Sequence, residues 1–365
     1  MQFCDLGAQY RAYQSEIDEA VASVLASGAF IHGPDVAALE TELAAFSGAP
    51  AVCACANGSD AILACLHALG LEMGDEVIVP DFTFFATAEM VVRAGARPAF
   101  ADIDAQTFLV TPQSIEAAIT PRTRGILAVS LFGQMPDFVG IRELAERRGL
   151  WVVEDAAQSF GAKRDGVAST NATVLAATSF YPSKPLGCYG DGGAVFGEKW
   201  LVEKARIFCN HGQTGRGIHG LSGINSRLDS LQAAILRVKL RHFPQELARR
   251  SEIATAYSQA LGAVAAVPAL PAECSSSWAQ YTVRIKDRDL VRSALADRGI
   301  PTMVHYPLPL HRQEAFAEFG YRDDLCPEAN RASREVLSLP MHGFVSRGEV
   351  GRVVEAMERG LTSLG

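Results

Sequence analysis

The feature that most constrains the fold of this 365-residue chain is a repeated alternation of short apolar runs with helical patterns. The apolar runs are bounded by Gly, Pro or Asp and are strand candidates at residues 76–80, 99–103, 126–132, 151–155, 172–180 and 193–197. Apolar residues at helical spacing lie between several of them, at residues 60–69, 87–94, 112–119 and 138–148. The alternation predicts an α/β domain with a mostly parallel sheet covered on both faces. Ligands of such sheets bind at the carboxyl ends of the strands.

The two ends of the chain depart from this alternation. A helix at residues 13–27 and a second helix from Asp35 precede the first strand candidate. A glycine-rich loop at residues 210–223 comes before the other predicted elements, which are helices at 228–240, 245–261, 289–298 and 349–361 and strands at 278–285 and 301–306. We therefore expect a large domain at residues 1–243 and a smaller C-terminal α+β domain at residues 244–365.

Charge and cysteine usage argue against several classes of protein. The net charge is −8 and no basic block occurs, so we expect no nucleic-acid partner. No apolar run is long enough for a membrane span and no leader-like segment opens the chain, which favours a cytoplasmic protein. The eight cysteines and the histidines lack the spacing of a metal site, so we expect none. Most thiols should be buried as small hydrophobes, while a redox role for Cys188 stays open.

Lys184 stands in a loop that is shaped by prolines and glycines. Pro182 and Pro185 flank it, and four glycines follow before residue 194. These residues favour a defined loop over a helix. Such a loop can hold one amine inside a cleft, where a desolvated lysine becomes a nucleophile for aldehydes. The alternative for Lys184 alone is a surface lysine in a turn.

Three other strand ends carry candidate site residues. Gly58 and Ser59 stand at a helix start, where free N–H groups can bind a phosphate, although an ordinary helix cap gives the same pattern. Asp155 ends a strand, where its carboxylate could pair with a cationic ring nitrogen or merely cap a loop. An aromatic residue at 82–85 could stack on a flat ring or pack in the core. A lysine, an anion site and an acid are together what pyridoxal phosphate (PLP) requires.

Several motifs together resemble one protein family across essentially the whole chain. They are Asn-Gly-Ser-Asp-Ala (57–61), Glu-Asp-Ala-Ala-Gln (154–158), Ser-Phe-Tyr-Pro-Ser-Lys (179–184), Gly-Asp-Gly-Gly-Ala (190–194) and Asn-Ser-Arg-Leu-Asp-Ser-Leu-Gln-Ala-Ala (225–234). The chain resembles the fold-type I, PLP-dependent sugar aminotransferases of the DegT/DnrJ type. This resemblance implies a large domain with a mostly parallel, mixed seven-stranded sheet and a smaller C-terminal α+β domain. Each motif alone is weak, whereas the set is specific.

The resemblance also implies roles for individual residues. Lys184 would form the internal aldimine, and Asp155 would bind the pyridine nitrogen. The remaining cofactor-binding residues would be Gln158 beside the ring, Phe84 stacked on it, Gly58, Ser59 and Ser179 at the phosphate, and Asn225 at the phosphate from the other subunit of a homodimer. Because the retained lysine distinguishes aminotransferases from the family's dehydratase branch, transamination is favoured.

A closer resemblance is to aminotransferases that act on UDP-2-acetamido-2-deoxy-3-oxo-D-glucuronate. It is carried by segments 183–193, 279–284 and 305–311. In that branch Arg227 would meet the sugar carboxylate with two hydrogen bonds, although an ion pair at a helix start is an equal alternative. His305 and Tyr306 would line the sugar site or serve a core or inter-domain role.

The implied reaction moves an amino group from L-glutamate to a 3-oxo nucleotide sugar, in the synthesis of a surface polysaccharide of the O-antigen type. Two alternatives stay open: the same chemistry on another sugar, such as a dTDP-linked 3-oxo-6-deoxyhexose or a 4-oxo sugar, and a non-catalytic PLP-binding regulator. A nicotinamide-dependent oxidoreductase is disfavoured, because no Gly-x-Gly-x-x-Gly turn follows the first strand.

Overall fold

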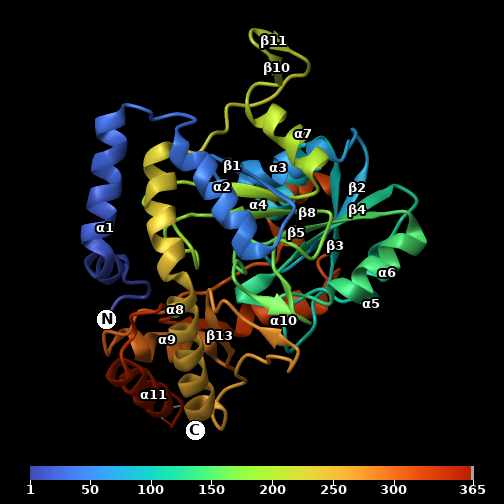
Figure 1. Ribbon diagram of the computed structural model, residues 1–365. Helices are drawn as coiled ribbons and strands as arrows, with labels where there is room; N and C mark the ends of the chain where they lie inside the picture. Colours follow the sequence, from blue (N-terminus) through green and yellow to red (C-terminus); the bar gives the residue numbers. More distant parts are fainter. Residues whose placement is uncertain (363–365) are drawn as a thin grey trace.

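The computed structural model describes residues 1–362, and its centre is a seven-stranded sheet (Figure 1). In spatial order the strands are β1 (Ala51–Cys55), β9 (Gly193–Gly197), β8 (Leu175–Ser179), β5 (Trp151–Asp155), β4 (Thr123–Val129), β2 (Glu76–Pro80) and β3 (Arg97–Ala101). Neighbouring strands are parallel except at β9, which runs antiparallel to both β1 and β8. The mostly parallel seven-stranded sheet expected from the sequence is confirmed.

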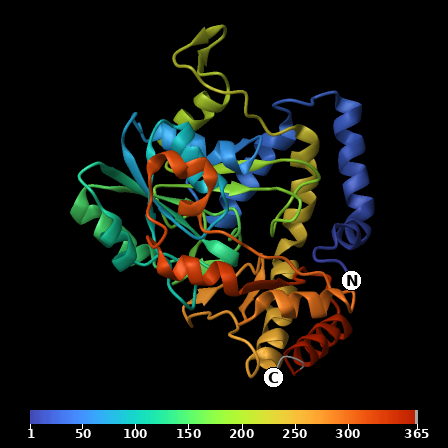
Figure 2. The ribbon, with the colours of Figure 1, turned by 180° about the vertical axis from the view of Figure 1, so that it is seen from behind.

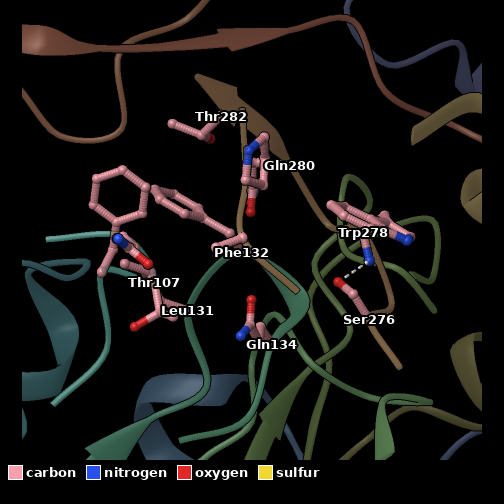
Figure 3. Close-up of a pocket in the computed structure, with 12 residues that line it drawn as sticks. Thr107, Leu131, Phe132, Gln134, Ser276, Trp278, Gln280 and Thr282 are labelled. Carbon is pink, nitrogen blue, oxygen red and sulfur yellow. Dashed lines mark hydrogen bonds between the residues drawn. The ribbon is translucent and has the colours of Figure 1, made fainter. Parts of the chain in front are cut away.

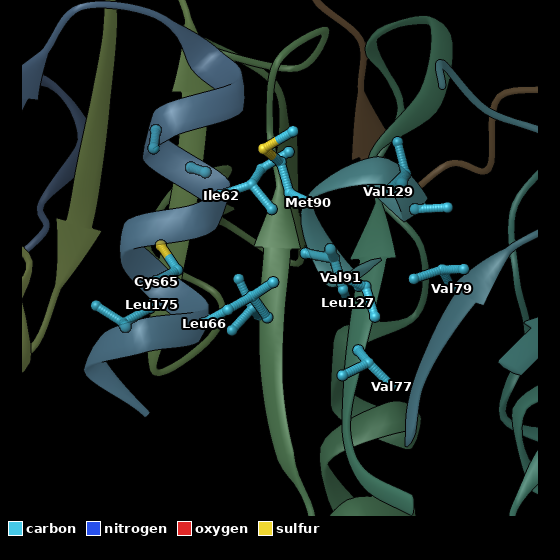
Figure 4. Packing of buried hydrophobic residues seen from close by; sticks show 14 of the residues in the cluster. Ile62, Cys65, Leu66, Val77, Val79, Met90, Val91, Leu127, Val129 and Leu175 are labelled. Carbon is cyan, nitrogen blue, oxygen red and sulfur yellow. The ribbon is translucent and has the colours of Figure 1, made fainter. Parts of the chain in front are cut away.

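Helices cover both faces of this sheet. One face carries α3 (Gly58–Ala68), α4 (Ala86–Arg93) and α7 (Lys199–Cys209), and the other carries α2 (Pro34–Ser47), α5 (Pro112–Ala118), α6 (Phe138–Arg148) and α8 (Ser230–Leu261). Along β2, Val77 and Val79 join the core under α3 and α4 (Figure 4), whereas Ile78 joins the core under α5 and α6. Since the strands are buried on both faces, they read as nearly continuous apolar runs.

Six strands, all except β9, end at one edge of the sheet. β8, β5, β4, β2 and β3 are parallel neighbours, and β1 shares their direction because it is antiparallel to β9, which is itself antiparallel to β8. Cys55 and Ser179 both pair with Gly193, so the ends of β1 and β8 lie level with each other. This edge therefore receives the candidate residues that follow β1, β2, β5 and β8.

The 32-residue helix α8 links the sheet to the C-terminal part of the chain (Figures 1 and 2). The sequence predicted two separate helices here, at 228–240 and 245–261, and this prediction was wrong because α8 continues through Pro244. A proline removes one helical hydrogen bond. Buried side chains hold the helix on both sides of that point, with Leu240 and Phe243 before it and Ile253 and Tyr257 after it.

The helix α1 (Leu6–Ser27) packs along the outer side of α8, at the edge of the molecule in Figure 1. It begins earlier than expected from the sequence, because the Asp5 side chain caps it by accepting a hydrogen bond from the Ala8 N–H at 2.8 Å. Gly28, with φ of 67°, ends it. As a result α8 is covered by α1 on one side and by the sheet core on the other.

Beyond α8 a second hydrophobic core forms around an antiparallel strand pair, β13 (Tyr281–Arg284) and β14 (Val336–Leu339). The helices α9 (Arg288–Ala296) and α11 (Arg347–Thr362) contribute to it. The strand expected at 301–306 was wrong, since Met303 makes only an isolated bridge to Ser338. Prolines stand at 301, 307 and 309, and they lack the N–H groups that a longer ladder needs.

The segment between β13 and β14 also returns to the large sheet. Its elements η2 (Leu310–Arg312), η3 (Glu314–Phe319) and α10 (Pro327–Glu335) place apolar side chains in the core beneath α3 and α4. The boundary expected at residues 243 and 244 falls within α8. The division into domains 1–243 and 244–365 therefore stays a prediction, and its last three residues lie outside the described range.

Two elements of the sheet layer were missed in the sequence. β1 consists of small residues, Ala-Val-Cys-Ala-Cys, and α7 directly follows β9. The glycine-rich loop contains a short hairpin, β10 (Gln213–Gly215) and β11 (Ile218–His219), which projects at the top of Figure 1.

Within residues 1–362, no helix combines the length and the apolar character needed to cross a membrane.

Candidate active site

A cleft of about 1010 Å³ opens at the carboxyl edge of the sheet. It is lined by most residues that the sequence singled out: Gly58, Ser59, Phe84, Asp155, Gln158, Ser179, Lys184, Asn225, His305 and Tyr306. These residues end or follow β1, β2, β5 and β8, or belong to the segments before α8 and η2. Segments far apart in the chain therefore converge on one space of the size that small-molecule sites have.

Lys184 lies in this cleft on the loop that follows β8. Its backbone N–H donates to the Tyr181 carbonyl at 2.8 Å, which fixes the turn around it. Burial lowers the pKa of the Lys184 ammonium, and the nearby Asp155 carboxylate offsets only part of that effect. A larger fraction of the amine is therefore neutral and nucleophilic near neutral pH.

Asp155 is buried at the end of β5 and is held by two hydrogen bonds. The Thr87 hydroxyl donates to its Oδ2 at 2.8 Å, and the Ala157 N–H donates to its Oδ1 at 3.1 Å. Burial raises the pKa of the Asp155 carboxyl, while Thr87, Ala157 and Lys184 lower it by smaller amounts. A cationic group placed beside this carboxylate would favour its ionised form.

The N-terminus of α3 forms a candidate anion site. The Asn57 side chain caps the helix by accepting a hydrogen bond from the Asp60 N–H at 2.8 Å. The N–H groups of Gly58 and Ser59 precede it in the first turn, where a helix has no internal acceptors for them. A Cβ at Gly58 would come within 2.7 Å of the Ser179 Cβ, so the end of β8 lies directly against this turn. Two hydroxyl groups and a helix terminus therefore meet at one place.

Gln158 has a defined orientation beside Asp155. Its Oε1 accepts a hydrogen bond from the Phe132 N–H at 2.7 Å, so its Nε2 must be the donor to the Tyr306 hydroxyl at 3.0 Å. One further N–H of this amide remains for a ligand. Burial raises the pKa of Tyr306, which keeps its hydroxyl protonated.

His305 and Phe84 lie on the cleft wall as well. Burial and the nearby charge of Lys184 lower the pKa of His305 to about 4, so its ring is neutral at physiological pH. Its Nδ1 lies 2.9 Å from the Ser338 hydroxyl. The Phe84 side chain is 54% exposed, and its ring centre lies 6.2 Å from that of Tyr306. Such an exposed aromatic face at a cleft can stack on a flat ligand.

Two predicted residues come from the glycine-rich segment, and the structure places them differently. Asn225 is exposed and lines the cleft of its own chain. Arg227 lines a separate cavity of about 180 Å³, where its guanidinium lies 3.3 Å from the Asn210 side-chain oxygen. The single chain therefore does not bring Arg227 together with Lys184. The roles predicted for Asn225, at the phosphate of a second subunit, and for Arg227, at the sugar carboxylate, stay predictions.

The sequence analysis did not single out Thr87, which supports the cleft residue Asp155, or the buried Glu154 next to it in the chain. Thr87 orients Asp155 directly, but its position was predicted only as part of a helix. Glu154 points to the opposite side of β5 and is fully buried, with hydrogen bonds from Ser130 and Ser169 hydroxyls and from the Thr170 N–H. Burial raises the pKa of Glu154. The sequence signal that could have pointed to Glu154 is the adjacent pair of carboxylates, Glu154 and Asp155, at the end of an otherwise apolar strand.

One cluster of possible metal ligands occurs among the described residues, formed by Asp81, His311 and Cys326. The carboxylate of Asp81 already accepts two hydrogen bonds from His311, from the ring Nδ1 at 2.6 Å and the backbone N–H at 2.8 Å. His311 Nε2 lies 3.1 Å from the Asp323 carbonyl oxygen. Since the ring nitrogens have partners, the cluster serves to tie η2 to the end of β2.

A second, small cavity lies next to the cleft behind Gln280 (Figure 3). Its labelled walls include Thr107, Phe132, Gln134 and Trp278. Its volume is about 20 Å³, enough for roughly one water molecule. It is therefore too small for a substrate, and the large cleft is the candidate active site.

The cleft residues fit pyridoxal phosphate. Lys184 supplies an amine for the aldehyde, Asp155 a buried carboxylate for the ring nitrogen, and the α3 terminus a cradle for the phosphate. The contact that a Cβ at Gly58 would make with Ser179 shows that this cradle is closed tightly on one side.

Comparisons with known proteins find relatives over nearly the whole chain. The sequence profile of the DegT/DnrJ/EryC1/StrS aminotransferase family matches residues 11–358. A UDP-2-acetamido-2-deoxy-3-oxo-D-glucuronate aminotransferase from Pseudomonas aeruginosa is 45% identical over 359 residues, which cover 98% of this chain and 99% of that protein. A pleiotropic regulatory protein from Geobacillus stearothermophilus is 44% identical, with 96% of each chain covered. A dTDP-3-amino-3,4,6-trideoxy-alpha-D-glucose transaminase from Streptomyces venezuelae is 40% identical, with 97% and 94% covered.

Solved structures show the same fold over nearly the whole chain. The crystal structure of S. venezuelae DesV in complex with a ketimine intermediate has a TM-score of 0.96 and 40% identity, with 98% of each chain covered. The crystal structure of NtdA from Bacillus subtilis with bound cofactor PMP has a TM-score of 0.90 and 30% identity, with 96% of this chain and 82% of that chain covered.

Proposed function

Since the chain belongs to the DegT/DnrJ/EryC1/StrS aminotransferase family, we propose that it transfers the amino group of L-glutamate to C3 of UDP-2-acetamido-2-deoxy-3-oxo-D-glucuronate. It is a PLP-dependent aminotransferase that acts on keto sugar nucleotides. The observation that carries the proposal is the meeting of Lys184, Asp155 and the α3 terminus in one cleft. The 3-amino sugar would then enter surface polysaccharide synthesis of the O-antigen type.

When bound, PLP supplies an electron sink for the carbanion chemistry of amino transfer. In this proposal Asp155 keeps the proton on the ring nitrogen, and Gln158 directs its remaining N–H toward the ring. Lys184, whose pKa is lowered by burial, takes the proton from the α-carbon of glutamate and later delivers one to C3 of the sugar. Gly58, Ser59 and Ser179 hold the phosphate at the α3 terminus.

The choice of sugar is supported by the 45% identity to the P. aeruginosa enzyme. The test is to incubate purified protein with L-glutamate and a panel of 3-oxo and 4-oxo nucleotide sugars, and to quantify 2-oxoglutarate and amino sugar by mass spectrometry. We expect the UDP-linked 3-oxo uronate to give the highest kcat/KM. A higher value for any neutral sugar in the panel would reject the proposed substrate.

A dTDP-linked 3-oxo-6-deoxyhexose is the second candidate substrate, supported by the 40% identity to the S. venezuelae transaminase. Arg227 distinguishes the two, because a guanidinium favours a carboxylate-bearing sugar. For a uronate substrate, Arg227→Ala should raise KM at least about tenfold, the loss of one charged hydrogen bond, with little effect on a neutral sugar. Equal effects on both sugars would argue against a carboxylate contact.

A non-catalytic regulator is the remaining alternative, and the name of the G. stearothermophilus relative motivates it. The presence of Lys184 in the cleft favours catalysis. Adding L-glutamate to the PLP-loaded protein should produce the absorption spectrum of pyridoxamine phosphate. A spectrum unchanged by glutamate would favour the regulator.

We also propose a homodimer whose cleft is completed by Asn225 and Arg227 of the second subunit. Exposed apolar side chains that could be covered in such a dimer include Phe30, Ile31 and Ile218. A mixture of Lys184→Ala and Asn225→Ala dimers tests this by subunit exchange. If Asn225 acts across the interface, the mixed dimer contains one fully equipped cleft and regains activity. If Asn225 acts within its own chain, every cleft lacks one residue and the mixture stays inactive.

A further inference from the structure

Lys239 is a buried cation that none of the roles above uses. It lies on α8 and is only 1% exposed to solvent. Its ammonium lies 4.9 Å from the centre of the Tyr189 ring. Burial lowers the pKa of Lys239 to about 8, although the carboxylate of Glu246 opposes this. A buried ammonium is costly, and an apolar chain of the same length would fill the space at lower cost. Its retention therefore calls for a specific contact.

That contact is with the loop that carries Lys184. The Lys239 ammonium donates a hydrogen bond to the Gly187 carbonyl oxygen. Gly187 closes the loop, since a Cβ there would lie 2.5 Å from the Pro182 carbonyl oxygen. Just beyond it, the Cys188 N–H donates to the Phe180 carbonyl at 2.7 Å. The loop around Lys184 is thus compact and closes at Gly187. This closing point is held by the hydrogen bond from Lys239 of α8.

A second, uncharged contact supports the same arrangement. Gln232 lies two helical turns before Lys239 on α8, and its side chain accepts a hydrogen bond from the Tyr189 N–H at 2.9 Å. Two helical turns after Lys239 on the same face of α8, both oxygens of Glu246 accept hydrogen bonds from the Gln9 side chain of α1 at 2.9 Å. The helix that presents Lys239 is therefore itself held in place by α1.

We propose that Lys239 is a positioning residue for amino transfer, holding the closing point of the Lys184 loop through its hydrogen bond to Gly187. This rests on the role proposed for Lys184. Without that bond the loop can open at Gly187, and the Lys184 amine samples positions from which it cannot reach the reacting carbon. Misplacement by about 1 Å can cost on the order of a hundredfold in rate.

The variant Lys239→Met removes the donor and keeps the length of the side chain. Lys204→Met is the matched control, because the Lys204 ammonium also lies over an aromatic ring, 4.8 Å from the centre of Trp200, but on α7 and away from the loop. The first measurement is amide hydrogen exchange of the full-length, cofactor-free proteins. The second is the rate at which saturating L-glutamate changes the absorption of the bound cofactor. Melting temperature checks that each variant is folded.

For Lys239→Met we expect the amide exchange rate to rise about tenfold at Cys188 and Tyr189 but not in β5 or β8. We expect the absorption change driven by glutamate to slow by about 10- to 100-fold, which is the range for the loss of one charged hydrogen bond. Lys204→Met should match the wild type. Wild-type values of both measurements would overturn the proposal, as would exchange that rises equally throughout the sheet. If Lys239→Met does not fold, Lys239→Gln is measured against the same criteria. A wild-type protein that does not respond to glutamate would refute the proposed function instead, and exchange would still decide whether Lys239 holds the loop.

Discussion

The hydrogen bond from Thr87 to Asp155 offers a sharp test of how this cleft works. Thr87→Val replaces the hydroxyl by a methyl group of similar volume, so the packing of α4 changes little. It removes the donor that lies 2.8 Å from Asp155 Oδ2 and leaves the Ala157 N–H in place at 3.1 Å. A hydrogen bond to a charged group contributes about 1.5–3 kcal/mol. Because one of the two bonds survives, we expect a loss near the lower end of that range.

A loss of about 1.5 kcal/mol corresponds to roughly a tenfold slower reaction, since each factor of ten equals about 1.36 kcal/mol. The same loss raises the pKa of Asp155 further. A carboxyl with a higher pKa is protonated at a higher pH, so the acid limb of the pH–rate profile should move to higher pH. The assay is the single-turnover reaction with saturating L-glutamate, followed by absorbance between pH 5 and pH 9.

Thr178→Val is the matched control, because this buried threonine donates to the neutral Ala156 carbonyl at 3.0 Å rather than to Asp155. It should leave the acid limb unchanged. If Thr87→Val left both the rate and the acid limb at wild-type values, the argument that Asp155 acts as an ionised, hydrogen-bonded carboxylate would fail.

Three further predictions follow from the structure. Lys184→Ala should abolish turnover and the visible absorption of the bound cofactor together, and turnover at a normal rate would refute its role. Gly58→Ala should weaken phosphate binding, seen as a higher Kd for PLP in fluorescence titration, because the new Cβ would lie 2.7 Å from the Ser179 Cβ; an unchanged Kd would contradict the phosphate site at α3. Burial alone would lower the pKa of His311, but Asp81 outweighs it and the pKa is raised. The stability this contributes is present below about pH 6.5 and is lost as pH rises through the folded-state pKa. His311→Asn should therefore cost about 3 kcal/mol in urea unfolding at pH 6 and flatten the decline at higher pH, whereas a parallel pH profile would exclude this pair as its cause.

The parts of the site that could be predicted from sequence are those fixed by local pattern and by sheet topology. The strand 151–155 was predicted with the bounds that β5 has, which placed Asp155 at its end. Lys184 could be assigned to a loop because prolines and glycines surround it. Once the strands are parallel, their carboxyl ends must share an edge, so Phe84, Asp155 and Lys184 could be placed near each other without coordinates, whereas Gly58 follows β1, which the sequence analysis missed.

What could not be predicted depends on how whole elements pack. Lys239 stands in a long helix, where a lysine is usually solvent-exposed. It is buried where the Lys184 loop and α1 both pack against α8. Likewise Pro244 predicts a helix end, and side chains buried on both sides of it keep α8 continuous. Arg227 had the right charge for a carboxylate, but the path of segment 210–229 directs it to a different cavity from that of Lys184.

The electrostatics of the cleft connect these observations. Lys184 and Asp155 attract each other, yet burial outweighs that attraction for both, lowering the pKa of the amine and raising that of the carboxyl. In the protein alone, each pKa is therefore shifted toward the neutral form of its group. A ligand that brings a positive ring nitrogen to Asp155 would favour the ionised carboxylate, and an aldehyde on the same ligand would use the neutral amine of Lys184. The large apolar cores beneath α3 and around α8 can stabilise such a strained site. Thr87 donates a hydrogen bond to Asp155, and Lys239 donates one to the loop that carries Lys184. In our proposal both bonds have the same effect, because each holds one of the two opposing groups in position.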